Sequence, residues 1–172
     1  RLTFAAEPTL GCIGVAPEGD FSPRSGPAGY WGGNLDYRLV SEGNTVMLPV
    51  FHAGALLFFG DGHAVQGDGE AVGSGVETSL DVEVQVELRK GQKLNGPRME
   101  TASEIVSIGA THEAPALDRT VEMATADMLA WLVNGFGLTP AEAHLTIGTQ
   151  ARYDIITLHG SVGLRISKLA LR

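Results

Sequence analysis

Residues 117–137 read LDRTVEMATADMLAWLVNGFG, and their pattern indicates that the chain is not an all-β protein. Apolar side chains recur at spacings of three and four, which gives one buried face of an amphipathic helix. The glycines at 135 and 137 predict where this helix ends. The apolar face consists of Leu117, Val121, Ala124, Met128, Leu132 and Val133.

A second helix is predicted directly after the first. Thr139 and Glu142 have the spacing of a capping box, and Pro140 between them suits the first turn of a helix. This helix is expected to reach about Gly148. Two helices near residues 117–148 therefore follow a region that has the patterns of strands and loops.

The clearest predicted strand is Leu80 to Leu88, where apolar residues alternate with acidic and amide residues, the period of a strand with one wet face. Residues 1–38 are rich in Gly and Pro and are expected to form irregular loops around short strands. Further strands are expected at Thr45 to Phe51, Ala55 to Phe59, Ile105 to Gly109, Tyr153 to Leu158 and Leu164 to Leu171.

This order of strands, two helices and strands predicts a β-rich α+β fold with a mixed or antiparallel β sandwich or a barrel-like sheet as its core. The 172 residues and 18.1 kDa suit one domain over residues 1–172, either whole or as a fragment of a longer chain. Glycine accounts for 23 of 172 residues, about twice the usual ~7%, which favours turns and close backbone contacts.

Composition disfavours several classes of partner. Twenty acidic and twelve basic residues give a net charge of -8, which repels nucleic acid and anionic membranes. No apolar stretch approaches the ~20 residues that span a bilayer. The single cysteine, Cys12, forms no internal disulfide and is interpreted as a structural residue. Without a visible signal peptide, a cytoplasmic location is expected.

The segment Gly60 to Glu70 concentrates side chains that bind metal. Asp61, His63, Asp68 and Glu70 offer oxygen and imidazole donors, which divalent ions accept. The alternating glycines would let these side chains converge. An EF-hand loop is excluded because its third position would be His63. The alternative is an acidic loop whose carboxylates face water.

A second cluster, Gly29 to Asp36, combines aromatic and polar residues with flexible backbone. As a site, Tyr30 and Trp31 would form a pocket wall, Asn34 would polarise a carbonyl group, and Asp36 would bind metal. The alternative is a tight turn in which Asn34 adopts a left-handed conformation and Asp36 caps a neighbour.

Several sequence blocks, in this order and spacing, resemble the acetamidase/formamidase family over nearly the whole chain. The blocks are residues 11–17 (GCIGVAP), 29–36, 48–50 (LPV), 54–57 (GALL), 60–70, 76–77, 97–101 (PRMET), 123–132 and 138–143 (LTPAEA).

The resemblance implies an amidase, a hydrolase of small linear amides that converts formamide or acetamide to a carboxylate and ammonia. It further implies a homo-oligomer. It places the chain in the C-terminal portion of longer family members, so a missing N-terminal segment or subunit would contribute to the site.

A mechanism is suggested by the absence of a credible serine or cysteine nucleophile. Amide hydrolysis then depends on water activated by a divalent metal ion. Our hypothesis is that Asp36, Asp61 and His63 hold the ion, with zinc favoured over calcium. Glu70 would act as general acid and base, and Asn34 would stabilise the oxyanion. Pocket size would be restricted by Tyr30, Trp31 and Phe59.

Other candidates are less specific. Glu77 is expected either to orient His63 or to be a solvated strand end, and His52, His144 and His159 are interpreted as structural histidines. The competing hypothesis for the whole chain is a non-catalytic module that binds a structural metal ion or serves assembly. That module would bind metal without turning over an amide.

Overall fold

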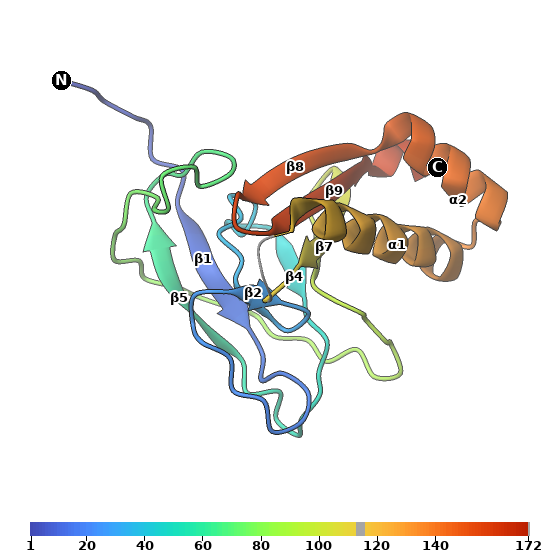
Figure 1. Cartoon of the computed structure of the whole chain (residues 1–172), viewed down its shortest axis with the longest axis horizontal. Helices are drawn as coiled ribbons and strands as arrows, with labels where there is room; N and C mark the ends of the chain where they lie inside the picture. Colours follow the sequence, from blue (N-terminus) through green and yellow to red (C-terminus); the bar gives the residue numbers. More distant parts are fainter. Residues whose placement is uncertain (113–115, 172) are drawn as a thin grey trace.

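The computed structural model describes residues 1–112 and 116–171 and confirms the β-rich α+β fold. Within these residues it contains nine strands, two α helices and a short 3-10 helix, Lys168–Leu171. The strands form two antiparallel sheets, and neither closes into a barrel (Figure 1). Of the predicted cores, the one built from antiparallel sheets is therefore confirmed, and the barrel-like sheet is not. No helix in this described part of the chain has the length and apolar character to cross a bilayer.

The first sheet contains four short strands in the order β2-β3-β1-β5. Its central strand β1 pairs with β3 on one side and with β5 on the other, so that Cys12 lies opposite both Asn34 and Gly60. The strands are β1 (Thr9–Gly14), β2 (Ala28–Gly29), β3 (Gly32–Asn34) and β5 (Phe58–His63).

The second sheet contains five strands in the order β4-β6-β7-β9-β8. Its strands are β4 (Thr45–Met47), β6 (Arg98–Glu100), β7 (Glu104–Ala110), β8 (Arg152–Thr157) and β9 (Ser161–Ser167). The two helices are α1 (Leu117–Phe136) and α2 (Pro140–Gln150).

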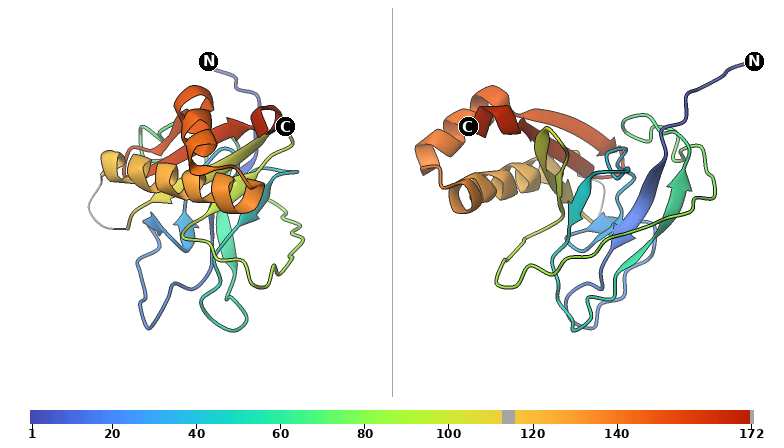
Figure 2. Two further views of the ribbon diagram at one scale, coloured as in Figure 1. Left: turned by 90° about the vertical axis from the view of Figure 1, so that its right-hand side faces the viewer. Right: turned by 180° about the vertical axis from the view of Figure 1, so that it is seen from behind.

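The second sheet is the middle layer of the fold (Figure 2). On one face it packs against α1 and α2 through a core that includes Ile105, Met128, Leu132 and Leu164. Gly109 allows this close approach, because a Cβ there would lie 2.0 Å from the carbonyl oxygen of Thr120. The opposite face packs against the segment after β3 and the first sheet. That core consists of Ala28, Leu35, Tyr37, Val40, Met99, Val106, Ile108, Ala110 and Ile156.

Both predicted helices are confirmed. Thr139 accepts a hydrogen bond from the backbone N–H of Glu142, and the Glu142 side chain bonds back to Thr139, which completes the capping box. The first helix ends at Gly137, whose φ of 72° is left-handed. Local sequence therefore determines these helix boundaries.

The predicted strand at Leu80 to Leu88 is wrong, because these residues form no regular secondary structure. Val82, Val84, Val86 and Leu88 are all exposed, although the alternating pattern predicted a buried apolar face. A period of two describes a strand only where a neighbouring strand supplies backbone partners. No such partner lies beside this segment in the described residues.

The other strand predictions are correct in place but not in length. The strand expected at Thr45 to Phe51 ends at Met47, and the strand expected at Ala55 to Phe59 begins only at Phe58. Ala55 and Leu56 have positive φ values of 56° and 54°, which no strand accommodates. The remaining predicted strands correspond to β7, β8 and β9 within a few residues.

Candidate metal centre and adjoining cavity

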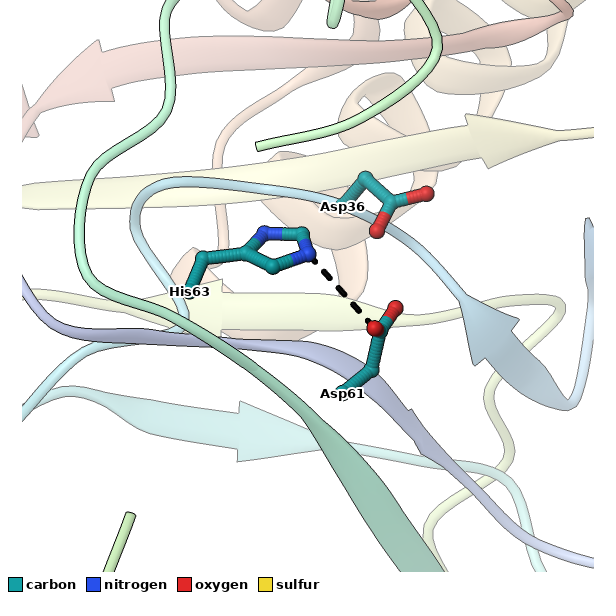
Figure 3. A group of neighbouring side chains, drawn as sticks. All are labelled: Asp36, Asp61 and His63. Atoms are coloured by element: carbon teal, nitrogen blue, oxygen red, sulfur yellow. Dashed lines mark ion pairs between the residues drawn. The ribbon is translucent and has the colours of Figure 1, made fainter. Parts of the chain in front are cut away.

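Three predicted metal ligands converge beside the first sheet: Asp36, Asp61 and His63 (Figure 3). One candidate ligand atom from each lies within 4.8 Å of the others. Asp61 and His63 belong to β5, two positions apart, so the segment Gly60 to Glu70 begins inside a strand. Asp36 follows β3, and its backbone N–H donates a 2.8 Å hydrogen bond to the carbonyl of Gly11.

Gly11 explains how side chains from β5 and from the segment after β3 can meet. It belongs to β1, the strand between β3 and β5. A Cβ at Gly11 would lie 2.6 Å from Asp36 Oδ1 and 2.6 Å from Asp61 Oδ2. The cluster thus occupies the space that a side chain at Gly11 would fill. Gly75 covers His63 in the same way, because its Cβ would lie 2.9 Å from the ring carbon Cγ.

Two buried polar atoms of the cluster have no hydrogen-bond partner in the described residues: Asp36 Oδ1 and His63 Nδ1. The residues themselves are deeply buried, with exposed fractions of 3% for Asp36 and 1% for His63. The imidazole Nε2 lies 3.6 Å from Asp61 Oδ1 and 3.3 Å from Glu77 Oε1. An unpaired buried oxygen beside an imidazole and a second carboxylate fits a divalent metal ion. Glu77 therefore contacts the same imidazole nitrogen that faces Asp61, and its role in orienting His63 stays a prediction.

The backbone at this site is unusual. Asp36, Asp61 and Glu70 have φ values of 50°, 62° and 43°, in the left-handed region that non-glycine residues rarely adopt. Such conformations cost about 1–3 kcal/mol each and persist where surrounding structure imposes them. The fold therefore holds these three acids in place. By contrast, Asp68 of the same segment is exposed and pairs with Arg38 at 2.6 Å, as a solvated loop residue would.

The carboxylates lie close enough to repel one another. Burial, and then the neighbouring Glu70 and Asp61 carboxylates, raise the pKa of Asp36 to about 8. A divalent cation among them would reverse this effect by favouring the charged forms. Burial, followed by Asp61 and Asp36, likewise raises the pKa of the Cys12 thiol to about 11. A thiol with a raised pKa is a poor nucleophile, which supports a structural role for Cys12.

A cavity of about 250 Å³ adjoins the cluster and lies between the two sheets. Asp36 and Glu70 contribute to one side of it, together with Asn34. Glu70 follows Gly69, whose backbone bonds to Ile155 and Leu158 of the β8–β9 hairpin at 2.8 and 2.9 Å. The complete lining is Gly26, Pro27, Ala28, Asn34, Asp36, Glu70, Thr111, Thr157, His159, Gly160 and Ser161.

The predicted catalytic residues Glu70 and Asn34 thus meet at the cavity. The side-chain amide of Asn34 donates to Asp36 Oδ2, so Asn34 helps to hold the metal-ligand candidate in place. Its role as an oxyanion donor stays a prediction.

The predicted pocket aromatics lie elsewhere. Trp31 is buried and packs edge-on against Phe21 and Tyr30. Phe59 is exposed on β5, the edge strand of its sheet. None of Tyr30, Trp31 and Phe59 is among the described residues that line the cavity. Their role in substrate binding also stays a prediction.

One wall of the cavity, the hairpin between β8 and β9, has no signal in the sequence. Thr157, His159, Gly160 and Ser161 line it, although His159 was interpreted as a structural histidine. No local motif marks these residues, because the cavity forms only when the hairpin meets the segment around Glu70.

Comparison with known proteins agrees with this geometry. The model of the acetamidase/formamidase family matches residues 15–150, which include Asp36, Asp61, His63 and Glu70. The chain belongs to the acetamidase/formamidase family. A comparison with curated proteins finds no match.

Solved acetamidase structures share the fold. The acetamidase of Yersinia enterocolitica is 34% identical with a TM-score of 0.91, over 97% of this chain and 50% of that chain. A predicted acetamidase/formamidase of Thermoanaerobacter tengcongensis is 33% identical with a TM-score of 0.88, over 96% and 55% of the two chains. The acetamidase of Bacillus halodurans is 32% identical with a TM-score of 0.86, over 94% and 55%. The present chain therefore spans about half the length of these acetamidases.

Proposed function

We propose that this acetamidase/formamidase family member hydrolyses the C–N bond of small linear carboxamides, such as formamide and acetamide, with a divalent metal ion as cofactor. The observation that carries the proposal is the cluster of buried Asp36, exposed Asp61 and buried His63 beside a small cavity that Glu70 also lines. The names of the similar structures, acetamidases and an acetamidase/formamidase, support the substrate class.

The donor set favours zinc. One imidazole and two carboxylates are common zinc ligands in catalytic sites, and such sites keep a coordination position open. Calcium is the alternative, but it usually takes six to eight oxygen ligands. When bound, the ion would polarise water and the amide carbonyl.

The protein side chains supply the proton transfers. A new C–O bond forms when water attacks the amide carbon, and the carboxylate of Glu70 accepts the proton that water loses. Glu70 returns this proton to the nitrogen as the C–N bond breaks, so the products are a carboxylic acid and ammonia. Asn34 holds Asp36 through its hydrogen bond, and the left-handed backbone fixes Glu70 toward the cavity.

The size of the cavity suits a small substrate. Pockets for drug-sized ligands usually measure about 300–1,000 Å³. The cavity here is about 250 Å³, and both sheets contribute fixed backbone to its wall. Amides with a long acyl chain would need a larger space.

The test is ammonia release from formamide and acetamide by the complete protein, with a chelator and with single metal ions added back. We expect release that the chelator abolishes and that zinc restores. Asp68→Asn is the matched control, because Asp68 belongs to the same segment but pairs with Arg38 in solvent. Folded, metal-loaded protein that releases no ammonia would contradict the proposal and support the non-catalytic metal-binding module.

A further inference from the structure

The cavity has two chemically different walls. One wall contains the acidic residues Asp36 and Glu70, and the β8–β9 hairpin forms the other with Thr157, His159 and Ser161. We propose that this hairpin recognises the amide –NH₂ group of the substrate through His159 and the paired hydroxyls of Thr157 and Ser161. The protein then selects primary amides over N-substituted amides. This inference rests on the proposed amidase function.

The hairpin is fixed relative to Glu70. Gly69 forms two backbone hydrogen bonds to it, and the N–H of Thr111 donates to the Gly160 carbonyl at 3.3 Å. These contacts tie the hairpin to the segment of Glu70 on one side and to the end of β7 on the other. Because the wall is anchored from both sides, its residues have a defined position beside the cavity that Asp36 and Glu70 also line.

The hydroxyl groups of Thr157 and Ser161 are buried, and both can still accept a hydrogen bond. Thr157 Oγ1 and Ser161 Oγ lie 2.8 Å apart, and both residues are less than 10% exposed. A hydroxyl group has one proton and two lone pairs, so one mutual hydrogen bond leaves acceptor positions on both oxygens. Buried acceptors of this kind favour a ligand that brings N–H donors.

His159 adds a further acceptor on the same wall. It lies in the turn between β8 and β9 and lines the cavity, and a neutral imidazole has one nitrogen that accepts a hydrogen bond. A primary amide has two N–H donors on one nitrogen, which matches acceptors on the histidine and the hydroxyl pair. The carbonyl oxygen of the same amide then faces Asp36 and the other candidate metal ligands, where a cation would attract it. Glu70 follows Gly69, which bonds to the hairpin, and therefore lies at the nitrogen end of the substrate.

An N-methyl amide fits this wall poorly. It lacks one of the two donors and brings a methyl group to a wall of polar atoms. Its binding would leave either His159 or the buried hydroxyl pair without a donor, and sites that lose such a hydrogen bond discriminate strongly. We therefore expect selection at the nitrogen end of the substrate, independent of the acyl group.

The experiment compares acetamide with N-methylacetamide in the complete, metal-loaded protein. The unsubstituted protein should prefer acetamide at least tenfold in kcat/KM. His159→Ala should lower kcat/KM for acetamide at least tenfold, mainly by raising KM. It should also reduce the kcat/KM ratio of acetamide to N-methylacetamide. His159→Gln keeps a hydrogen-bonding side chain and should recover part of the loss. His144→Ala, an exposed histidine on α2 away from the cavity, should leave both values unchanged.

The possible failures are distinguishable. If the unsubstituted protein releases ammonia but His159→Ala keeps its kcat/KM and its preference, the hairpin assignment is overturned and the amidase proposal stands. If the unsubstituted protein hydrolyses neither formamide nor acetamide, both proposals fail. Metal content and melting temperature should match among all variants, since His159 lies in an exposed turn and is not a metal ligand.

Discussion

Asp154 and Asp36 are both buried acids between the two sheets, but their surroundings are opposite. Asp154 lies 2.8 Å from the Nε of Arg165, accepts a 2.7 Å hydrogen bond from the Tyr37 hydroxyl, and lies 3.9 Å from Arg38. Asp36 faces the carboxylates of Asp61 and Glu70. Within the described residues it has no arginine or lysine partner.

We infer from this difference that Asp154 stabilises the fold, whereas Asp36 destabilises it. Around Asp154 the guanidinium groups compensate the buried charge, so the group joins β8, β9 and the segment after β3. Around Asp36 the charge is uncompensated, and its pKa is raised by burial and by its acidic neighbours. A buried acid with a perturbed pKa in a cleft is a candidate functional residue. The following predictions test this distinction, in order of expected effect.

Asp36→Asn should have the largest effect on activity. It keeps the shape of the side chain but removes one of three candidate metal ligands. We expect kcat for acetamide to fall at least about a thousandfold, equivalent to about 4 kcal/mol, together with a loss of bound metal. Ammonia release and metal content of the purified variant measure both. A variant with normal metal content and turnover would remove Asp36 from the site.

Arg165→Met should instead weaken the fold. It leaves Asp154 and Glu104 without their shared guanidinium group, and breaking a buried ion pair from one side typically costs about 3 kcal/mol or more. Urea denaturation should show this loss in the free energy of unfolding, while metal content stays normal. Lys168→Met is the control, because its ion pair with Glu100 is partly exposed and should contribute about 1 kcal/mol or less.

Glu70→Gln should separate proton transfer from metal binding. It keeps the size of the side chain and removes its basicity, so kcat should fall about a hundredfold, within the usual range for general acid–base catalysis. Metal content should stay near that of the unsubstituted protein. Full turnover by this variant would eliminate Glu70 as the base.

Gly11→Ala should disturb the cluster without touching any charge. The added Cβ would lie 2.6 Å from two carboxylate oxygens, so Asp36 or Asp61 must move. We expect metal affinity to fall about tenfold, as for changes that displace ligands indirectly. Gly19→Ala is not a suitable control, since φ there is 72°. Gly60→Ala is better matched, because a Cβ at Gly60 meets no atom within 4 Å and φ is not left-handed.

The metal-free protein offers the smallest and most direct test. In the presence of a chelator, Asp36→Asn should raise the melting temperature by about 2–4 °C, the shift expected for relief of about 1 kcal/mol in a chain of this size. Asp154→Asn should lower it, because that carboxylate is compensated. If both substitutions lower the melting temperature, the contrast between the two acids is wrong.

Sequence patterns predicted the proximity of Asp61 and His63 better than the positions of Asp36 and His159. Asp61 and His63 are two positions apart, so their common location follows from any extended backbone. Asp36 was predicted as a ligand from its residue type and from a family resemblance, and it joins them only because β3 and β5 both pair with β1. His159 was missed, since nothing near it in sequence indicates the cavity.

The sequence by itself determined the two helices and their ends, because a period of 3.6 and a capping box act within a few residues of the chain. It also determined which donor atoms are available to a metal ion. Only the tertiary structure decided that Leu80 to Leu88 forms no strand, since a strand depends on a partner that lies far away in sequence. For the same reason, only the docking of the β8–β9 hairpin against the segment of Glu70 created the cavity.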